Sequence, residues 1–295
     1  MKRRDLLKMA SAAAVGSLAF PWRWTEAADK GNQRVLYFTR SAGFEHSVVH
    51  REGEQLSHSE KILTELGKSH GFEVECTKDG SVFDGDLGKY DAIAFYTSGD
   101  LTKPDALKTP PMSPQGKDNL LAAVAAGKGF LGFHAATDSF HSPGPGNENQ
   151  SNVDPYIQML GGEFVSHGPQ QEAAITLTSK FPGAPDIEIG KSIKLLEEWY
   201  ASKNFAPDLH VILVQETAGM QGKEYQRPNF PCTWARMQGK GRVFYTSLGH
   251  REDVWTNPIF QALTLGGLAW AMGNIEADVT PNFDKVTPEA RQMPK

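Results

Sequence analysis

The sequence lacks the local motifs of several large enzyme classes. No GxSxG segment stands at a strand-to-helix turn, since the match GKSHG at residues 67–71 lies at the end of the helix expected over 48–69. A hydrolase with a serine nucleophile would therefore be without its usual signature. No GxxxxGK(S/T) segment is present, and no GxGxxG follows the first apolar run. These absences disfavour nucleotide-driven chemistry and Rossmann-type dinucleotide binding.

Cysteine and basic charge are also scarce. The two cysteines, Cys76 and Cys232, cannot form a disulfide framework. Both lie in apolar, strand-like segments, which favours buried thiols; one bridge in an oxidising compartment is the alternative. The 30 Lys and Arg residues are outnumbered by 35 Asp and Glu, and no long basic run occurs. Nucleic acid is therefore not an expected partner, because phosphate binding needs clustered basic side chains.

The first 27 residues have the composition of an export signal. The pair Arg3-Arg4 precedes a short apolar run from Met9 to Phe20, which is too short and too weakly apolar to span a membrane. The string RRDLLK resembles a twin-arginine signal, and cleavage before Ala28 is plausible. We expect a periplasmic or secreted mature protein without a membrane span; a lipid-surface anchor or a disordered basic arm is the alternative.

The remaining pattern predicts one α/β domain over residues 28–273. The runs at 34–38 and 90–97 are apolar on both faces, which is typical of strands covered by helices on each side. Helices are expected over 48–69 and from Ser113-Pro114, where serine caps and proline fits the first turn. Strands and helices that alternate in short units predict a doubly wound, mostly parallel sheet in three layers.

The second half of the chain predicts antiparallel additions to that sheet, a long loop at 138–153, a last helix at Asn257-Pro258 and a polar tail at 274–295. The expected additional strands lie at 173–178, 186–189, 193–200 and 210–216, followed by a hairpin over 232–247 that turns at 239–241.

Four histidines follow apolar or glycine-rich segments and are the candidate site residues: His46, His134, His167 and His250. His134 ends the buried run GFLGF, and ligands of open α/β sheets bind beyond the carboxyl ends of strands. Imidazole also titrates near neutral pH and serves as base or acid. Taken singly, each histidine is more often a hydrogen-bonded structural residue, so the prediction depends on their convergence.

A divalent metal, zinc or a similar ion, is one hypothesis for these four histidines, because neutral imidazoles suit it. The four histidines are far apart in sequence and form no HExxH motif, and the HxxxH pair His46 and His50 includes only one of them. Glu45 and Asp138 are candidates to orient an imidazole or to move a proton. In the adjacent pair Glu197-Glu198, at most one side chain faces a site if the segment is a strand, and surface solvation is the alternative for every one of these carboxylates.

Aromatic side chains near these segments offer flat faces for a sugar ring. The candidates are Trp199, Tyr200, Trp255 and Phe140, although each is more often a core residue. His141, in the long loop, is a further candidate for contact with a substrate.

Several motifs together resemble the ThuA-like (trehalose utilisation) family over residues 34–273. They are SAGFEHS, GKGFLGFHAATDSF, YIQMLGGEFVSHGP, EEWY and PCTWARMQGKGRVFYTSLGHREDVW. The family is similar in fold to class I glutamine amidotransferases, a flavodoxin-like sandwich whose corresponding turn carries a nucleophilic cysteine. His134 occupies that turn here, so the resemblance does not extend to glutamine amide hydrolysis.

The resemblance implies a role in disaccharide use through 3-keto-sugars that a partner oxidoreductase makes. A 3-keto group acidifies the neighbouring C–H, which allows elimination of the glycosidic group and later hydration. We therefore expect an exported enzyme that acts on a glycoside or 3-keto-sugar by elimination, hydration or hydrolysis. A non-catalytic carbohydrate-binding protein that uses the same crevice is the alternative.

Overall fold

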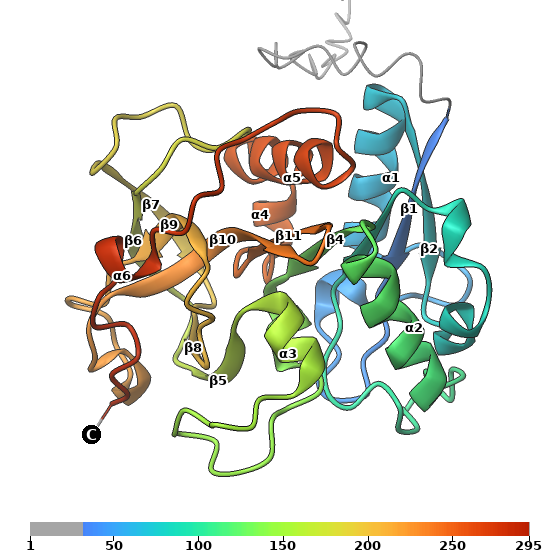
Figure 1. The fold of residues 1–295 in the computed structure, drawn as a ribbon, viewed down its shortest axis with the longest axis horizontal. Helices are drawn as coiled ribbons and strands as arrows, with labels where there is room; N and C mark the ends of the chain where they lie inside the picture. The colour runs from blue at the N-terminus through green and yellow to red at the C-terminus, as the bar shows by residue number, and fades with distance from the viewer. Residues whose placement is uncertain (1–31, 295) are drawn as a thin grey trace, which may run out of the picture.

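The computed structural model describes residues 32–294, and the predicted export signal lies outside them. These residues form a nine-stranded sheet with the order β2-β1-β3-β4-β11-β10-β9-β6-β7 and a separate pair, β5-β8 (Figure 1). The first five strands in this order are parallel: β2 Phe72–Thr77, β1 Gln33–Phe38, β3 Ala92–Phe95, β4 Gly129–Phe133 and β11 Gly241–Thr246. The predicted doubly wound, mostly parallel α/β fold is confirmed.

The other half of the sheet is antiparallel. Its strands are β10 Phe230–Gln238, β9 His210–Gln215, β6 Gln171–Leu177 and β7 Ser192–Glu197. The short pair consists of β5 Glu163–His167 and β8 Tyr200–Lys203. The predicted hairpin is confirmed, with Gln238 opposite Gly241, whereas the strand expected at 186–189 is wrong, because those residues form turns and bends.

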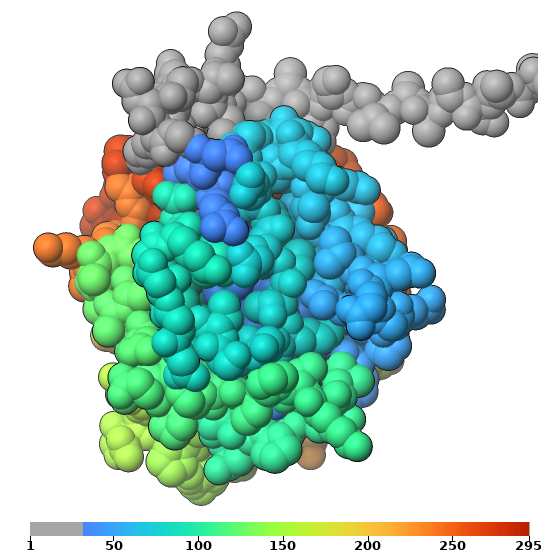
Figure 2. All heavy atoms as spheres, turned by 90° about the vertical axis from the view of Figure 1, so that its right-hand side faces the viewer, coloured from blue at the N-terminus to red at the C-terminus, as the bar shows by residue number. Residues whose placement is uncertain are grey.

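Helices cover both faces of the sheet. Figure 1 shows α1 His58–His70 and α5 Pro258–Ala271 on one side, and α2 Pro114–Ala125 and α3 Pro155–Leu160 on the other. Figure 2 looks at the β2 edge, which the early part of the chain, drawn in blue to green, covers. Two short helices, α4 Glu252–Trp255 and α6 Phe283–Val286, complete the fold. No helix in the described residues is long and apolar enough to cross a bilayer.

The helix ends follow from local capping. Ser113 caps α2 and Asn257 caps α5, each followed by proline, as the sequence predicts. The helix expected over 48–69 begins ten residues late, at His58, because Ser57 and Glu60 form a capping box there. The residues before it form a 3-10 turn at Ser47–Val49 and then a loop.

The polar tail is an ordered part of the fold. Asn282 accepts a hydrogen bond from the backbone N–H of Val211, and Phe283 and Ala290 are buried. Residues 280–290 therefore close over the start of β9. Cys76 and Cys232 are both free thiols; Cys232 is buried as expected, whereas Cys76 is only partly buried.

We predict that Ser113→Ala lowers the free energy of unfolding by about 1 kcal/mol, because Ser113 Oγ accepts the hydrogen bond from Gly116 N–H that caps α2. Urea unfolding measures the change. The control is Gln115→Ala, an exposed position in the same helix, which should stay within about 0.5 kcal/mol of the parent. Equal losses at both positions would contradict the capping role.

Candidate functional site

His134 is held in an unusual backbone conformation directly after β4. Its φ is +39°, a region that non-glycine residues seldom adopt and that is found where the surroundings fix the chain. Tyr245 donates a hydrogen bond to its carbonyl oxygen at 2.8 Å, and its own Nδ1 lies 2.7 Å from the carbonyl oxygen of Ser247. Because a carbonyl only accepts, Nδ1 carries the proton. The lone pair of Nε2 is left free on the other side of the ring.

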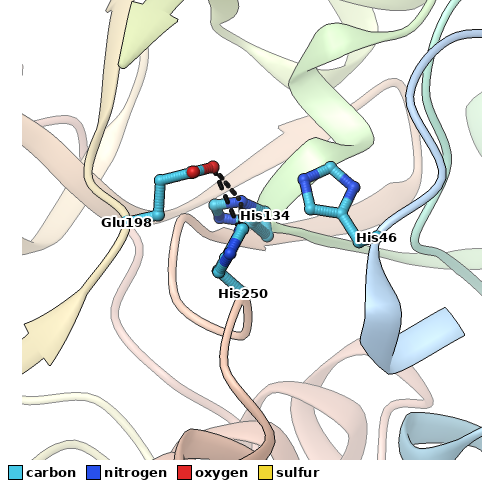
Figure 3. Close-up of side chains that lie close together, drawn as sticks. All are labelled: His46, His134, Glu198 and His250. Atoms are coloured by element: carbon cyan, nitrogen blue, oxygen red, sulfur yellow. Dashed lines mark hydrogen bonds and ion pairs between the residues drawn. The ribbon is translucent and has the colours of Figure 1, made fainter. Parts of the chain in front are cut away.

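Three of the four predicted histidines meet there, together with a glutamate (Figure 3). His46, His134 and His250 follow the parallel strands β1, β4 and β11, so they reach the same edge of the sheet. Glu198 comes from the opposite half, between β7 and β8. One donor atom from each of the four residues lies within 4.8 Å of the other three. We call these four residues the histidine cluster.

Burial and mutual charge control protonation in the histidine cluster. Burial, together with the neighbouring His134 and His250, lowers the pKa of His46 to about 2. Burial also lowers the pKa of His134. Burial alone would raise the pKa of Glu198, but the adjacent His134 and His250 outweigh it and hold that pKa below its usual range. At neutral pH the site therefore presents the neutral imidazoles of His46 and His134 beside an ionised carboxylate.

Two tyrosines line the histidine cluster. The Tyr200 ring lies 3.9 Å from the His134 ring, centroid to centroid, and its hydroxyl is 3.2 Å from His46 Nε2. Tyr96, which follows β3, packs against the rings of His46 and His134. Among the predicted aromatic contacts, Tyr200 is the one that the structure brings to the cluster.

Glu197 fixes the segment that carries Glu198. Its buried carboxylate accepts hydrogen bonds from the backbone N–H groups of Glu198 and Gly249, each at 2.9 Å. It therefore joins the β7–β8 connection to the loop that carries His250, and the adjacent Glu198 side chain faces the histidines.

His167 lies at the rim, outside the histidine cluster. Its Nδ1 is 3.3 Å from Glu198 Oε1, on the far side of the carboxylate, and its side chain is half exposed. The predicted set of four histidine ligands is thus corrected, because Glu198 stands where His167 was expected.

Glu45 and Asp138 contact other polar side chains, outside the histidine cluster. Glu45 forms an ion pair with Lys78 at 3.2 Å and lies 2.8 Å from His50 Nδ1, although its neighbour in sequence is His46. Adjacent side chains in extended backbone point to opposite sides, which separates the two. Asp138 contacts His141 at 2.7 Å.

Three of the predicted stacking residues belong to the core, so none offers a face to a sugar. Trp199 and Trp255 are fully buried and donate their indole N–H groups to the carbonyl oxygens of Gln171 and Gly249. Phe140 packs on Tyr156. Trp255 instead supports the loop before His250, which explains its place in a polar stretch of sequence.

A groove of about 650 Å³ opens beside the histidine cluster at His250. At its wall stands Phe44, whose side chain is 68% exposed and whose ring lies edge-on to His46 at 5.0 Å. Carboxylate, imidazole, amide and ammonium groups line the rest: Glu45, His50, Glu52, Gln55, His58 and Lys61. The groove thus combines one apolar face with many hydrogen-bonding groups.

His141 belongs to a structural network rather than to the cluster. It bridges Asp138 at 2.7 Å and the buried Glu163 at 3.2 Å. These hydrogen bonds raise the pKa of His141 to about 9. Burial would raise the pKa of Glu163, but hydrogen bonds from His141, Ser142 and Asn204 lower it to about 2. The network ties the long loop to β5.

The sequence interpretation missed Glu198, Tyr96 and Phe44. The EEWY segment drew attention to Glu198, but alternation alone does not say which glutamate of a pair faces inward. Tyr96 directly follows the buried strand β3, which pairs with β4, and this position is the signal that could have identified it. An isolated exposed phenylalanine such as Phe44 has no signature in sequence.

Comparisons with known proteins agree with this architecture. The family model described as trehalose utilisation, ThuA, matches residues 34–271. A ThuA-like protein from Bacteroides uniformis is similar with a TM-score of 0.58 and 18% identity, covering 81% of this chain and 91% of that one. A ThuA-like protein from Parabacteroides merdae gives 0.54 and 18%, with coverages of 89% and 97%. At this identity the likeness shows the shared fold. No curated protein matches the chain in sequence.

We predict that His141→Gln destabilises the protein more at pH 6 than at pH 10. The folded-state pKa of about 9 lies above the usual 6.5, so the pairing stabilises fully below about pH 6.5 and is lost as pH rises through 9. Urea unfolding at both pH values tests this, with His70→Gln, a histidine at the end of α1, as the control. A loss that does not depend on pH would contradict the charge-based role of His141.

Proposed function

The chain belongs to the ThuA (trehalose utilisation) family, and we propose that it is a carbohydrate-active enzyme that acts on a glycoside or 3-keto-sugar at the histidine cluster. The observation that carries the proposal is the convergence of His46, His134, His250 and Glu198 next to an open polar groove. Positioned acid–base groups beside a substrate-sized cavity are the usual mark of an active site.

The proposed reaction begins with proton removal next to the keto group. A neutral imidazole of the histidine cluster accepts the C2 proton of a 3-keto-glycoside, the electron pair forms the C1–C2 double bond, and the C1–O bond breaks. The leaving oxygen takes the proton back from the imidazolium. Glu198 lies 3.0 Å from His250 Nδ1 and 3.5 Å from His134 Nε2, where its charge stabilises either imidazolium. Addition of water across the double bond then completes a net hydrolysis.

The groove suits a polyhydroxylated ring. The exposed face of Phe44 offers an apolar surface for stacking, and the surrounding carboxylates and amides accept and donate hydrogen bonds. In this proposal the keto-sugar is supplied by an oxidoreductase, because the reaction consumes a carbonyl that an earlier oxidation of the sugar must create.

Thiol chemistry is not part of the proposal. Burial raises the pKa of Cys76 to about 12, and Cys232 is fully buried within β10, so neither offers a thiolate nucleophile. His134 occupies the turn after β4 instead, and the proposal does not include glutamine amide hydrolysis.

We predict that the wild-type protein consumes a 3-keto-glycoside and that His134→Asn lowers kcat by about 100-fold or more, because a positioned general base contributes about that much. Asparagine tolerates the left-handed backbone at this position. Loss of substrate is followed by chromatography, and thermal unfolding checks that the variant is folded. His70→Gln serves as the control with unchanged kcat. Binding without turnover in the wild type would overturn the enzyme and favour the carbohydrate-binding protein.

Export is a further part of the proposal. We predict that the mature protein is recovered in the periplasm or medium with an N-terminus near Ala28, because Arg3-Arg4 and the apolar run after it match a twin-arginine signal. Replacing both arginines with lysine should leave the precursor inside the cell. Cell fractionation and mass measurement of the intact chain test this. A full-length wild-type chain in the cytoplasm would contradict it.

A further inference from the structure

The donor atoms of three residues in the histidine cluster form a small triangle. His134 Nε2 lies 3.3 Å from His250 Nδ1 and 3.5 Å from Glu198 Oε2, and His250 Nδ1 lies 3.0 Å from the same oxygen. A zinc ion with bonds of about 2.0–2.1 Å in tetrahedral geometry separates its ligand atoms by about 3.3–3.4 Å. The triangle therefore matches one face of such a tetrahedron to within a few tenths of an ångström.

Hydrogen bonding alone satisfies this triangle poorly. His134 Nε2 has only a lone pair, since the proton of that ring is on Nδ1 beside Ser247. A single proton on His250 Nδ1 can be given to His134 Nε2 or to Glu198 Oε2, but not fully to both. A cation between the three atoms satisfies all of them at once. In addition, His46 Nδ1 is buried without a hydrogen-bond partner among the described residues.

Each of the three donor residues also contacts a polar partner on the side that faces away from the triangle. The remote atom of His134 is bonded to the Ser247 carbonyl, and the second oxygen of Glu198 faces His167. His250 Nε2 lies 2.9 Å from the side-chain amide of Gln170. An ion on His250 Nδ1 leaves a proton on Nε2, which the Gln170 oxygen accepts after rotation of the amide, in exchange for the hydrogen bond that this oxygen accepts from Arg251 at 2.6 Å. Outer partners of this kind are typical of metal ligands.

We propose that His134, His250 and Glu198 bind one divalent transition-metal ion of the zinc type. Two imidazoles and one carboxylate form a donor set that catalytic zinc sites use with a fourth position open to water or substrate. The donor atom of His46 lies within 4.8 Å of the others but outside their triangle, and we place it beside the open position. When bound, the ion supplies a Lewis acid for an oxygen of the substrate or for water.

This inference goes beyond the proposed function, because it holds whatever the substrate is. With the ion on His134 and His250, the imidazole left to accept the proton in the proposed reaction is His46, and His134→Asn then lowers kcat through loss of the ion. The test uses the full mature chain, purified without a histidine tag, and measures metal content by mass spectrometry of the elements. We expect about one ion per chain, removal by a chelator and rebinding of Zn²⁺. The Co²⁺-loaded protein should show the visible absorption of a low-coordinate site.

Variants separate the ligands from their neighbours. We expect His134→Asn and Glu198→Gln to lose stoichiometric Zn²⁺, whereas His46→Gln and the control His70→Gln keep it. Gln170→Leu should keep the site but weaken Zn²⁺ binding about 10-fold, measured by competition with a chelator. Loss of Zn²⁺ in His46→Gln would overturn the three-ligand assignment.

The outcomes also distinguish this inference from the enzyme proposal. A protein that contains no metal and shows no shift in Tm with stoichiometric Zn²⁺ overturns the metal site. If that metal-free protein still consumes a 3-keto-glycoside, the enzyme proposal stands alone. Stoichiometric Zn²⁺ without turnover overturns the enzyme proposal and leaves the metal site.

Discussion

The site depends on the parallel pairing of β1, β4 and β11. Parallel strands end at the same edge of a sheet, so loops that are far apart in sequence meet there. His46, His134 and His250 span more than 200 residues, yet their rings lie within about 5 Å of one another, centroid to centroid. Because backbone hydrogen bonds set the register of these strands, the imidazoles are positioned by the scaffold rather than by one another.

This geometry has an energetic cost that the fold offsets. Burying imidazoles side by side keeps them neutral, and a buried carboxylate is tolerated only where hydrogen bonds compensate for lost hydration. For Glu198, the partner at hydrogen-bond distance is His250 Nδ1, 3.0 Å from Oε2. The left-handed backbone of His134 is a second cost, which the hydrogen bonds with Tyr245 and Ser247 offset. Buried charge and backbone strain of this kind cost stability, and they occur most often at functional sites.

The sequence predicted the parallel core and the three histidines because both rest on local signals: apolar runs, caps and a histidine at each strand end. It did not predict Glu198, since the choice between Glu197 and Glu198 depends on where β7 ends and β8 begins. Trp255 was misplaced for a related reason: polar neighbours suggested exposure, while tertiary packing buries the indole against Phe133. Contacts between the two halves of the sheet are therefore the part that local patterns do not encode.

The carboxylate of Glu197 has a consequence for how the protein meets its ligand. By holding the backbone of Glu198 and of Gly249 together, it locks the antiparallel half of the sheet to the loop that ends the parallel half. The walls of the groove are therefore ordered before a ligand binds. Binding then does not carry the entropic cost of ordering a mobile groove. In such a groove, selectivity among ligands arises from the fixed shape and polarity of its walls.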